Sequence, residues 1–284
     1  MTQKCSNQLT QSEPTNSPPN QQQYANAEKF NARIRLHAQC ATNKYPWPLW
    51  VFDQFEKKEK LKILELGCGT GMLWQVNATR IPLDWDITLS DFSEGMLKET
   101  KDRLKTLKFE FKYEVINAES IPYPDNNFDA VIANHLLYHV PDLEKALAGI
   151  ARVLKPGGKL YSTTVGKNNM LEMKQLVTEF THDQKYQEVL GTIESNFSLD
   201  NGTEYLNRYF QAIHIVLYQN RLCINDAELL AEYVLSCNGL KPGVEVLNPG
   251  RAGEFKDFVQ NMIKTRDQIV ITTESGMFIC EKGQ

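Results

Sequence analysis

Residues 61–71, LKILELGCGTG, constrain the fold more than any other stretch of the chain. A short run of mostly branched aliphatic residues stops at three glycines, Gly67, Gly69 and Gly71, spaced two apart. Such a run is typical of a buried strand, and the glycines are typical of a turn into a helix. Because glycine has no Cβ, the backbone of this turn can approach a ligand closely. The stretch therefore predicts a turn that binds a nucleotide-type cofactor, although a tight turn that binds nothing has the same pattern.

The spacing of the glycines argues against two common cofactor motifs. A nicotinamide or flavin fingerprint has its third glycine at the position that Met72 occupies here. A phosphate-binding P-loop needs Gly-Lys-Ser/Thr, and no such sequence follows. The turn therefore favours a ligand that has no pyrophosphate to hold.

Charge and composition narrow the class of protein. The formal net charge of −4 over 284 residues weighs against a broad nucleic-acid surface, which relies on clustered lysine and arginine. The six cysteines form no C-x-x-C pair, so we expect reduced thiols. No opening segment resembles a signal peptide, and no apolar run reaches the about 18 residues of a membrane span. We expect a cytoplasmic protein with no membrane segment, and its oligomeric state is left open.

Strand and helix patterns alternate along residues 61–165. Apolar strand patterns return at 87–89, 109–115, 128–133 and 160–165, with helical stripes between most of them. This alternation predicts a parallel sheet with right-handed crossovers. The end of the chain, 269–280, is also β-rich, with a possible turn at 274–276.

The domain organisation follows from composition. Residues 1–23 are rich in Gln, Asn, Ser, Thr and Pro and predict a disordered tail. Residues 24–60 predict an N-terminal helical cap whose aromatic cluster, 45–52, packs in the core or covers a ligand as a lid. Residues 61–284 would form the main domain. An insertion is expected at about 167–208, where the chain is polar and longer than a usual connection of about 2–6 residues.

Asp91 ends the second predicted strand, 20 positions beyond Gly71. A carboxylate at this place can accept hydrogen bonds from both hydroxyls of a ribose. The alternative role is a helix N-cap, since Asp91-Phe92-Ser93 precedes a helical pattern. With the glycine turn upstream, we favour ribose binding.

Four blocks of the sequence together resemble the class I S-adenosylmethionine-dependent methyltransferases. They are E-x-G-x-G-x-G at 65–71, DFSEGML at 91–97, NAESIPYPDNNFD at 117–129 and RVLKPGG at 152–158. The resemblance is to the small-molecule branch, whose members include quinone-biosynthesis and natural-product methyltransferases. It implies a doubly wound α/β fold with a seven-stranded, mostly parallel sheet whose last strand is antiparallel.

The resemblance also implies a cofactor, S-adenosylmethionine, with S-adenosylhomocysteine as its product. The implied cofactor-binding residues are Glu65, Gly67, Gly69, Gly71, Asp91, Phe92, Ala118, Glu119 and Asn134. Glu65 and the glycine turn would flank the methionine portion, and Asp91 would take the ribose. Phe92, Ala118 and Glu119 would take the adenine. Asn134 would lie near the amino group and the reactive methyl. Many relatives carry Asp where Asn117 stands here, so the role of that side chain is in doubt.

His135, Tyr138 and His139 follow the fourth strand, beside the place to which a transferred methyl would point. If this turn is helical, the two histidines, four apart, share a face. A neutral imidazole can serve as a general base, and Tyr138 is another polar candidate. A structural role for these side chains is the alternative. No metal is expected, because no third ligand has metal-site spacing.

These features predict an enzyme that moves the sulfonium methyl of S-adenosylmethionine to a small organic acceptor. The absence of N/D-P-P-Y/F after the fourth strand disfavours methylation of nucleic-acid bases. Two alternatives stay open. One is a cofactor-binding protein without transferase activity. The other is an arsenite methyltransferase, which would need the thiolates of Cys40, Cys68 and Cys223 to converge.

Overall fold

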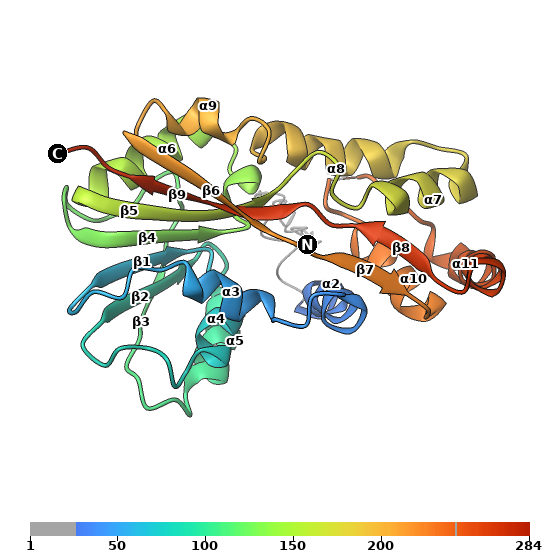
Figure 1. Cartoon of the computed structure of the whole chain (residues 1–284), viewed down its shortest axis with the longest axis horizontal. Coiled ribbons are helices and arrows are strands. Elements are labelled where there is room, and N and C mark those ends of the chain that lie inside the picture. The colour runs from blue at the N-terminus through green and yellow to red at the C-terminus, as the bar shows by residue number, and fades with distance from the viewer. Residues whose placement is uncertain (1–26, 242) are drawn as a thin grey trace, which may run out of the picture.

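A seven-stranded sheet organises the protein, whose structure, a computed structural model, describes residues 27–241 and 243–284 (Figure 1). The tail predicted at 1–23 lies outside the described residues. The strands are β1 (Lys62–Leu66), β2 (Asp86–Asp91), β3 (Lys112–Val115), β4 (Phe128–Asn134), β5 (Leu154–Val165), β6 (Ala212–Tyr218) and β9 (Ser275–Glu281). Their order is β3-β2-β1-β4-β5-β9-β6, and β9 alone runs in the direction opposite to the other six strands. The predicted doubly wound sheet with one antiparallel last strand is confirmed.

Helices cover both faces of this sheet, which explains why its central strands are almost continuously apolar. Successive residues of a strand point to opposite faces, so Ile63 and Leu64 of β1 enter different cores. The core containing Ile63 is closed by α3 (Trp47–Asp53), α4 (Met72–Val76) and α5 (Glu94–Leu104). The core containing Leu64 is closed by α6 (Leu143–Val153) and α9 (Gly202–Leu206). Across the described ranges, no helix has the length and apolar character of a membrane span.

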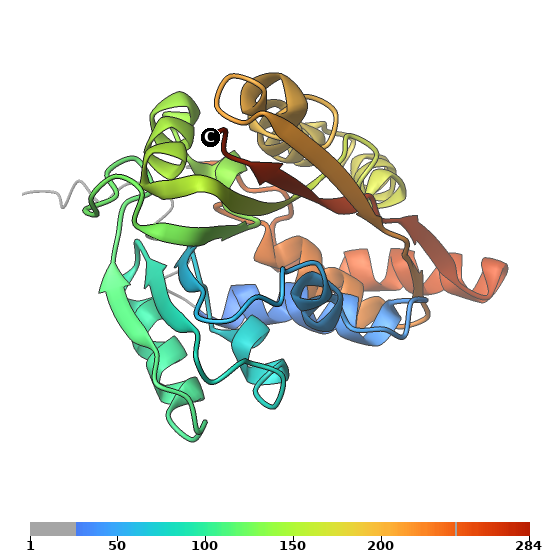
Figure 2. The same cartoon turned by 60° about the vertical axis from the view of Figure 1, so that its left-hand side comes forward.

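A second lobe is built on an extension of the sheet. β6 leads into β7 (Arg221–Ile224), and β8 (Ile269–Thr272) leads into β9, so that β7 and β8 form a two-stranded antiparallel ribbon beyond the main sheet (Figure 2). The other elements of the lobe are α2 (Ala27–Cys40), α7 (Leu171–Thr181), α8 (Lys185–Asn196), α10 (Ala227–Ser236) and α11 (Ala252–Arg266). Two short 3₁₀ helices, η1 (Leu137–His139) and η2 (Pro249–Arg251), complete the elements of the described chain.

The turn proposed at 274–276 is wrong. Ser275 and Gly276 belong to β9, where Gly276 pairs with Thr164 on one side and Leu217 on the other. A Cβ at Gly276 would lie 2.7 Å from the carbonyl oxygen of Val216. The glycine therefore lets two strands of the sheet approach closely, which is a known role of glycine within a strand.

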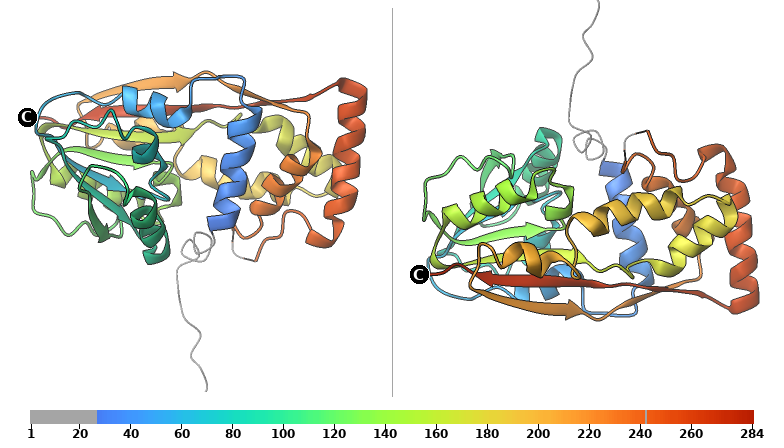
Figure 3. Two further views of the ribbon diagram at one scale, coloured as in Figure 1. Left: turned by 90° about the horizontal axis from the view of Figure 1, so that it is seen from below. Right: turned by 90° about the horizontal axis from the view of Figure 1, so that it is seen from above.

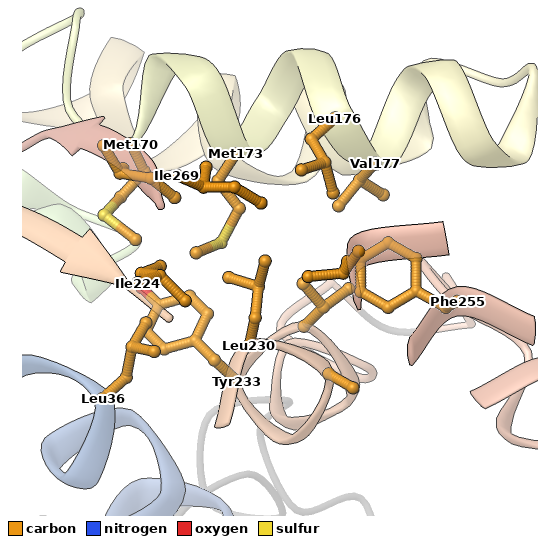
Figure 4. Close-up of a cluster of buried hydrophobic side chains, with 14 of the residues drawn as sticks. Leu36, Met170, Met173, Leu176, Val177, Ile224, Leu230, Tyr233, Phe255 and Ile269 are labelled. Atoms are coloured by element: carbon orange, nitrogen blue, oxygen red, sulfur yellow. The ribbon is translucent and has the colours of Figure 1, made fainter. Parts of the chain in front are cut away.

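Helix α2 stands between the sheet and the helices α10 and α11 (Figure 3). Its Leu36 is fully buried in the core of the second lobe. In that core, Met170, which precedes α7, and Met173, which belongs to α7, point toward Leu36 and toward Tyr233 of α10 (Figure 4). The helix thus packs against the second lobe through Leu36.

Asn77, which follows α4, holds α3 in place. Its side chain is fully buried, and its Nδ2 donates to the carbonyl oxygens of Pro48 at 2.9 Å and Leu73 at 2.8 Å. Its Oδ1 accepts from Nη1 of Arg80 at 2.9 Å. One side chain therefore bonds the first turn of α3 to the helix that follows the glycine turn.

Replacing Asn77 with Ala removes both donors and leaves buried carbonyl groups unsatisfied. We expect Asn77→Ala to lower the free energy of unfolding by about 1–3 kcal/mol, measured by urea denaturation. The exposed Asn261 of α11 provides the control, since Asn261→Ala should change that free energy by no more than about 0.5 kcal/mol. Equal effects of the two substitutions would contradict the bonding role of Asn77.

Candidate functional site

The glycine turn between β1 and α4 adopts a backbone that L side chains rarely adopt. Gly67, Gly69 and Gly71 have φ angles of 68°, 57° and 72°. A Cβ at Gly71 would lie 2.8 Å from Cγ2 of Thr100, and one at Gly67 would lie 3.0 Å from Cδ1 of Leu136. The turn therefore needs glycine both for its conformation and for its packing against neighbouring side chains.

Asp91, at the carboxyl end of β2, is bonded to the glycine turn. Its Oδ2 accepts from the backbone N–H of Gly69 at 3.1 Å, and its Oδ1 accepts from the N–H of Ser93 at 2.9 Å. Burial raises the pKa of Asp91, and the backbone donors offset part of that rise. Ser93, whose hydroxyl accepts from Met96 N at 3.3 Å, is the N-cap of α5, so Asp91 does not hold the N-cap position. A carboxylate offers about four lone-pair sites, which leaves Asp91 able to accept from a ligand as well.

Glu65 is buried at the end of β1 between two donors. Its Oε2 accepts from Nε1 of Trp74 at 2.6 Å, and its Oε1 accepts from Nδ2 of Asn134 at 3.3 Å. Burial raises the pKa of Glu65 to about 7, against the opposing effect of these two donors. Among the described residues, the buried Oδ1 of Asn134 has no hydrogen-bond partner. The site thus contains a carboxyl group and a vacant carbonyl acceptor side by side, which suits the ammonium group of an amino acid.

The residues expected around an adenine lie at the ends of β2 and β3. Phe92 has 37% of its surface exposed, whereas Ala118 is buried. Oε1 of Glu119 accepts from the backbone N–H of Asp142 at 2.8 Å, which ties this loop to the start of α6. Oδ1 of Asn117 accepts from the N–H of Glu119 at 2.9 Å, so the side chain of Asn117 shapes its own turn.

The turn after β4 is not a regular helix, so the condition under which His135 and His139 would share a helical face is not met. His135 has a left-handed backbone with φ of 48°, and its N–H donates to the carbonyl oxygen of Thr163 at 3.1 Å. Only Leu137–His139 form a helical turn, and it is 3₁₀. The ring of Tyr138 lies 4.5 Å from that of His139 and 6.1 Å from that of His135, between centroids. Left-handed non-glycine residues occur often at functional sites, and histidine is among the residues that tolerate this backbone.

Trp47 covers His135 from the side of α3. Its ring centroid lies 5.3 Å from that of His135 and 5.1 Å from that of Tyr218. Trp47 is half-buried, whereas Val51 and Phe52 of the same helix are buried in the core. The aromatic cluster therefore does two things, because one end of α3 packs in the core and the other lies beside the turn after β4.

The histidines at this place are neutral at pH 7. Burial, with a smaller contribution from the nearby His37, lowers the pKa of His135 to about 4. Burial also lowers the pKa of His139 to about 3, with Arg33 and His135 adding to the effect. A neutral imidazole can accept a proton, but one with so low a pKa holds it weakly.

Helix α2 contributes two residues that the sequence did not single out, Arg33 and His37. The ring of His37 lies 5.9 Å from that of Tyr233, and burial lowers the pKa of His37 to about 4. The two residues are four apart, so they share a face of the helix. The four-residue spacing of Arg33 and His37 could have been noticed in the sequence, but it does not predict which residues this face of α2 packs against.

The thiols do not converge. Cys68 belongs to the glycine turn, with its Sγ 3.8 Å from Oγ1 of Thr100, whereas Cys40 belongs to the core of the second lobe, near Cys223. Burial raises the pKa of both Cys40 and Cys68, which disfavours the thiolate. Within the described ranges, no group of three or more His, Cys, Asp or Glu residues is arranged to hold a metal ion. The arsenite alternative therefore lacks its thiolate cluster here.

Comparisons with known sequences agree with this geometry. Residues 64–162 match the model of a methyltransferase domain. The chain is 36% identical over 116 residues to a ubiquinone/menaquinone biosynthesis C-methyltransferase of Psychromonas ingrahamii, and 34% identical over 116 residues to one of Cronobacter sakazakii. Each match covers 40% of this chain and 46% of the relative. The chain thus matches about half the length of these curated relatives.

Solved structures with the same fold extend the likeness to most of the chain. The YcgJ protein of Bacillus subtilis has a TM-score of 0.56 at 16% identity, covering 83% of this chain and 97% of that one. Phosphoethanolamine N-methyltransferase 2 of Haemonchus contortus, solved with S-adenosyl-L-methionine, has a TM-score of 0.56 at 18% identity. That match covers 89% of this chain and 56% of the other. Residues 64–162 therefore match a methyltransferase domain, and the sheet that contains them has the fold of the solved methyltransferase structures.

Proposed function

We propose that this chain transfers the methyl group of S-adenosylmethionine to a small organic acceptor. The observation that carries the proposal is the vacant Oδ1 of Asn134, buried beside Glu65 at the carboxyl ends of β1 and β4. Ligands of open α/β sheets bind at this edge of the sheet, where the connections diverge to opposite faces. A curated domain match over residues 64–162 supports the same function.

The residues present fit the cofactor. Asn134 and Glu65 would hold the ammonium group, since one offers a free carbonyl oxygen and the other a carboxyl that a cation would ionise. Asp91 would accept from the ribose hydroxyls. Phe92, Ala118 and Glu119 would enclose the adenine, and the left-handed glycine turn would let backbone approach the ligand without side chains between. When bound, the cofactor supplies an activated methyl group on a sulfonium.

The chain itself would mainly align the acceptor. Orientation of reactants can supply as much as about 7–11 kcal/mol of a barrier, and a preactivated methyl requires little further chemistry. Where the acceptor must lose a proton, neutral His135 would accept it, and Tyr138 and His139 would orient that imidazole. Trp47 would exclude water from the same place, as part of an N-terminal cap formed by residues 24–60.

The partner class is a small molecule. The net charge of −4 and the sequence Asn134-His135-Leu136-Leu137 after β4 both argue against a nucleic-acid substrate. We place the protein in the cytoplasm on the pattern of its free cysteines. A cofactor-binding protein without transferase activity is distinguished by turnover, because such a protein would bind S-adenosylhomocysteine and release no methylated product.

Cofactor binding should depend on Asp91. We expect S-adenosylhomocysteine to bind Asp91→Ala at least tenfold more weakly than the parent, a loss of about 1.4 kcal/mol, in titration calorimetry. Asp86 at the other end of β2, an exposed residue paired with Lys112, gives the matched control, Asp86→Ala. Equal affinity in the parent and Asp91→Ala would remove Asp91 from the site.

Acceptor use should depend on Trp47. Trp47→Ala should raise KM for the acceptor by about tenfold or more and leave the affinity for S-adenosylhomocysteine within about twofold, because Trp47 lies beside His135 rather than beside the glycine turn. Tyr45→Ala, an exposed residue of the same segment, serves as the control. A loss confined to cofactor affinity would contradict a role of Trp47 in acceptor binding.

His135 should set the acidic limb of the turnover rate. Since protonation of its imidazole removes the base, the rate should fall as the pH drops through about 4. His135→Gln should lower kcat by about 10²–10⁴-fold and abolish that limb, measured as kcat against pH. The exposed His214 of β6 offers a control, His214→Gln. A loss under about threefold in His135→Gln would assign catalysis to alignment alone.

A further inference from the structure

Arg33 of α2 is half-buried, and one edge of its guanidinium group has no partner among the described residues. Its Nε and Nη2 are both buried, and neither has a hydrogen-bond partner among the described residues. Other basic residues of the same helix are engaged: Nζ of Lys29 donates to the carbonyl oxygen of Asn238 at 2.9 Å, and Arg35 pairs with Glu232 at 2.7 Å. Arg33 therefore differs from its neighbours in having no such partner.

Buried guanidinium N–H groups without a partner are costly for a folded protein. A buried donor without a partner destabilises the folded state, and more so when the group is charged. Such a cost persists where the group serves a ligand. Nε–H and Nη2–H lie on the same edge of the guanidinium plane, so they form two parallel donors. That edge matches the two oxygens of a carboxylate in a bidentate pair.

The surroundings of Arg33 belong to the proposed acceptor side of the site. The charge of Arg33 contributes to the lowered pKa of His139 after β4, and it also acts on Tyr233 of α10 and on Cys237, which follows that helix. His37, on the same helix face, acts in turn on His135. The cap helix, the turn after β4 and the second lobe thus meet around this guanidinium.

The titratable groups described near Arg33 are uncharged at pH 7, so Arg33 is the one cation among them. The three nearby histidines, His37, His135 and His139, are neutral at pH 7 because burial lowers their pKa values. Within the described ranges, no carboxylate forms an ion pair with Arg33. One fixed positive charge calls for one negative charge, which favours a carboxylate over a doubly charged phosphate.

We propose that the acceptor carries a carboxylate, which Arg33 binds through Nε and Nη2 while another group of the same molecule receives the methyl. This inference rests on the proposed function. The bound carboxylate is not itself the methylated group, since hydrogen bonds to a guanidinium reduce the nucleophilicity of its oxygens.

The test compares an acid with its uncharged counterpart. Hexanoate and hexanamide have nearly the same shape, so their difference in affinity isolates the charge. We expect hexanoate to bind the parent at least tenfold more tightly than hexanamide, in ligand-observed NMR titrations with and without saturating S-adenosylhomocysteine. In Arg33→Met the ratio should fall to near one, and in Arg33→Lys it should be intermediate, because a lysine keeps the charge and loses the paired donors.

Matched controls separate binding from folding. Arg35→Met, on the same helix but exposed, should keep the full preference for hexanoate. Arg33→Met should unfold at a temperature no lower than the parent, since it removes buried donors that have no partner, and hexanoate should raise that temperature in the parent but not in the variant.

Each other result overturns the proposal. No preference for hexanoate in the parent, or a preference that survives in Arg33→Met, removes Arg33 as the carboxylate site. Tighter binding of hexyl phosphate than of hexanoate rejects the carboxylate class. The affinity of the same samples for S-adenosylhomocysteine is read separately. A parent that fails to bind it rejects the proposed function, while the comparison of acid with amide still decides the role of Arg33.

Discussion

The buried carboxyl group of Glu65 joins the elements on which the site depends. It belongs to β1, it accepts from Trp74 of α4, and it accepts from Asn134 at the end of β4. β1 and β4 are neighbours in the sheet, and the chain leaves them for opposite faces. A polar group at the centre of three packed elements can be tolerated only when it is bonded, so Glu65 fixes how the two strands end relative to the glycine turn.

The same carboxyl group couples ligand binding to protonation. Because burial brings its pKa to about 7, Glu65 is partly protonated at neutral pH. A cation bound beside it favours the ionised form, so a proton leaves when that cation arrives. The hydrogen bonds from Trp74 and Asn134 also favour the ionised form, so they act in the same direction as a bound cation.

The residues expected to bind the cofactor could be predicted from short-range patterns in the sequence. Features that depend on contacts between residues far apart in the chain could not. The glycine turn and Asp91 were readable because a strand, a turn and a carboxylate stand at fixed short spacings. The role of Arg33 was not readable, because a helix face says nothing of the α10 residues it meets 200 positions later. The left-handed backbone of His135 was missed because its cause, two hydrogen bonds to Thr163, lies in another strand. Gly276 was taken for a turn because a glycine between two strand patterns has the same sequence whether the chain reverses or runs on.

The continuity of β6 with β7, and of β8 with β9, has a mechanical consequence. Only two residues separate the strands of each pair, so the second lobe is held to the sheet by a paired ribbon rather than by a linker. Bending the lobe away would break the register of that ribbon. Helix α2 is fastened to it near its C-terminal end, where Thr42 N donates to Arg221 O at 2.9 Å. The lobe and the sheet are therefore continuous through the ribbon, and α2, tied to the ribbon after its C-terminal end and to α10 through Arg35 and Glu232, is held to the same frame.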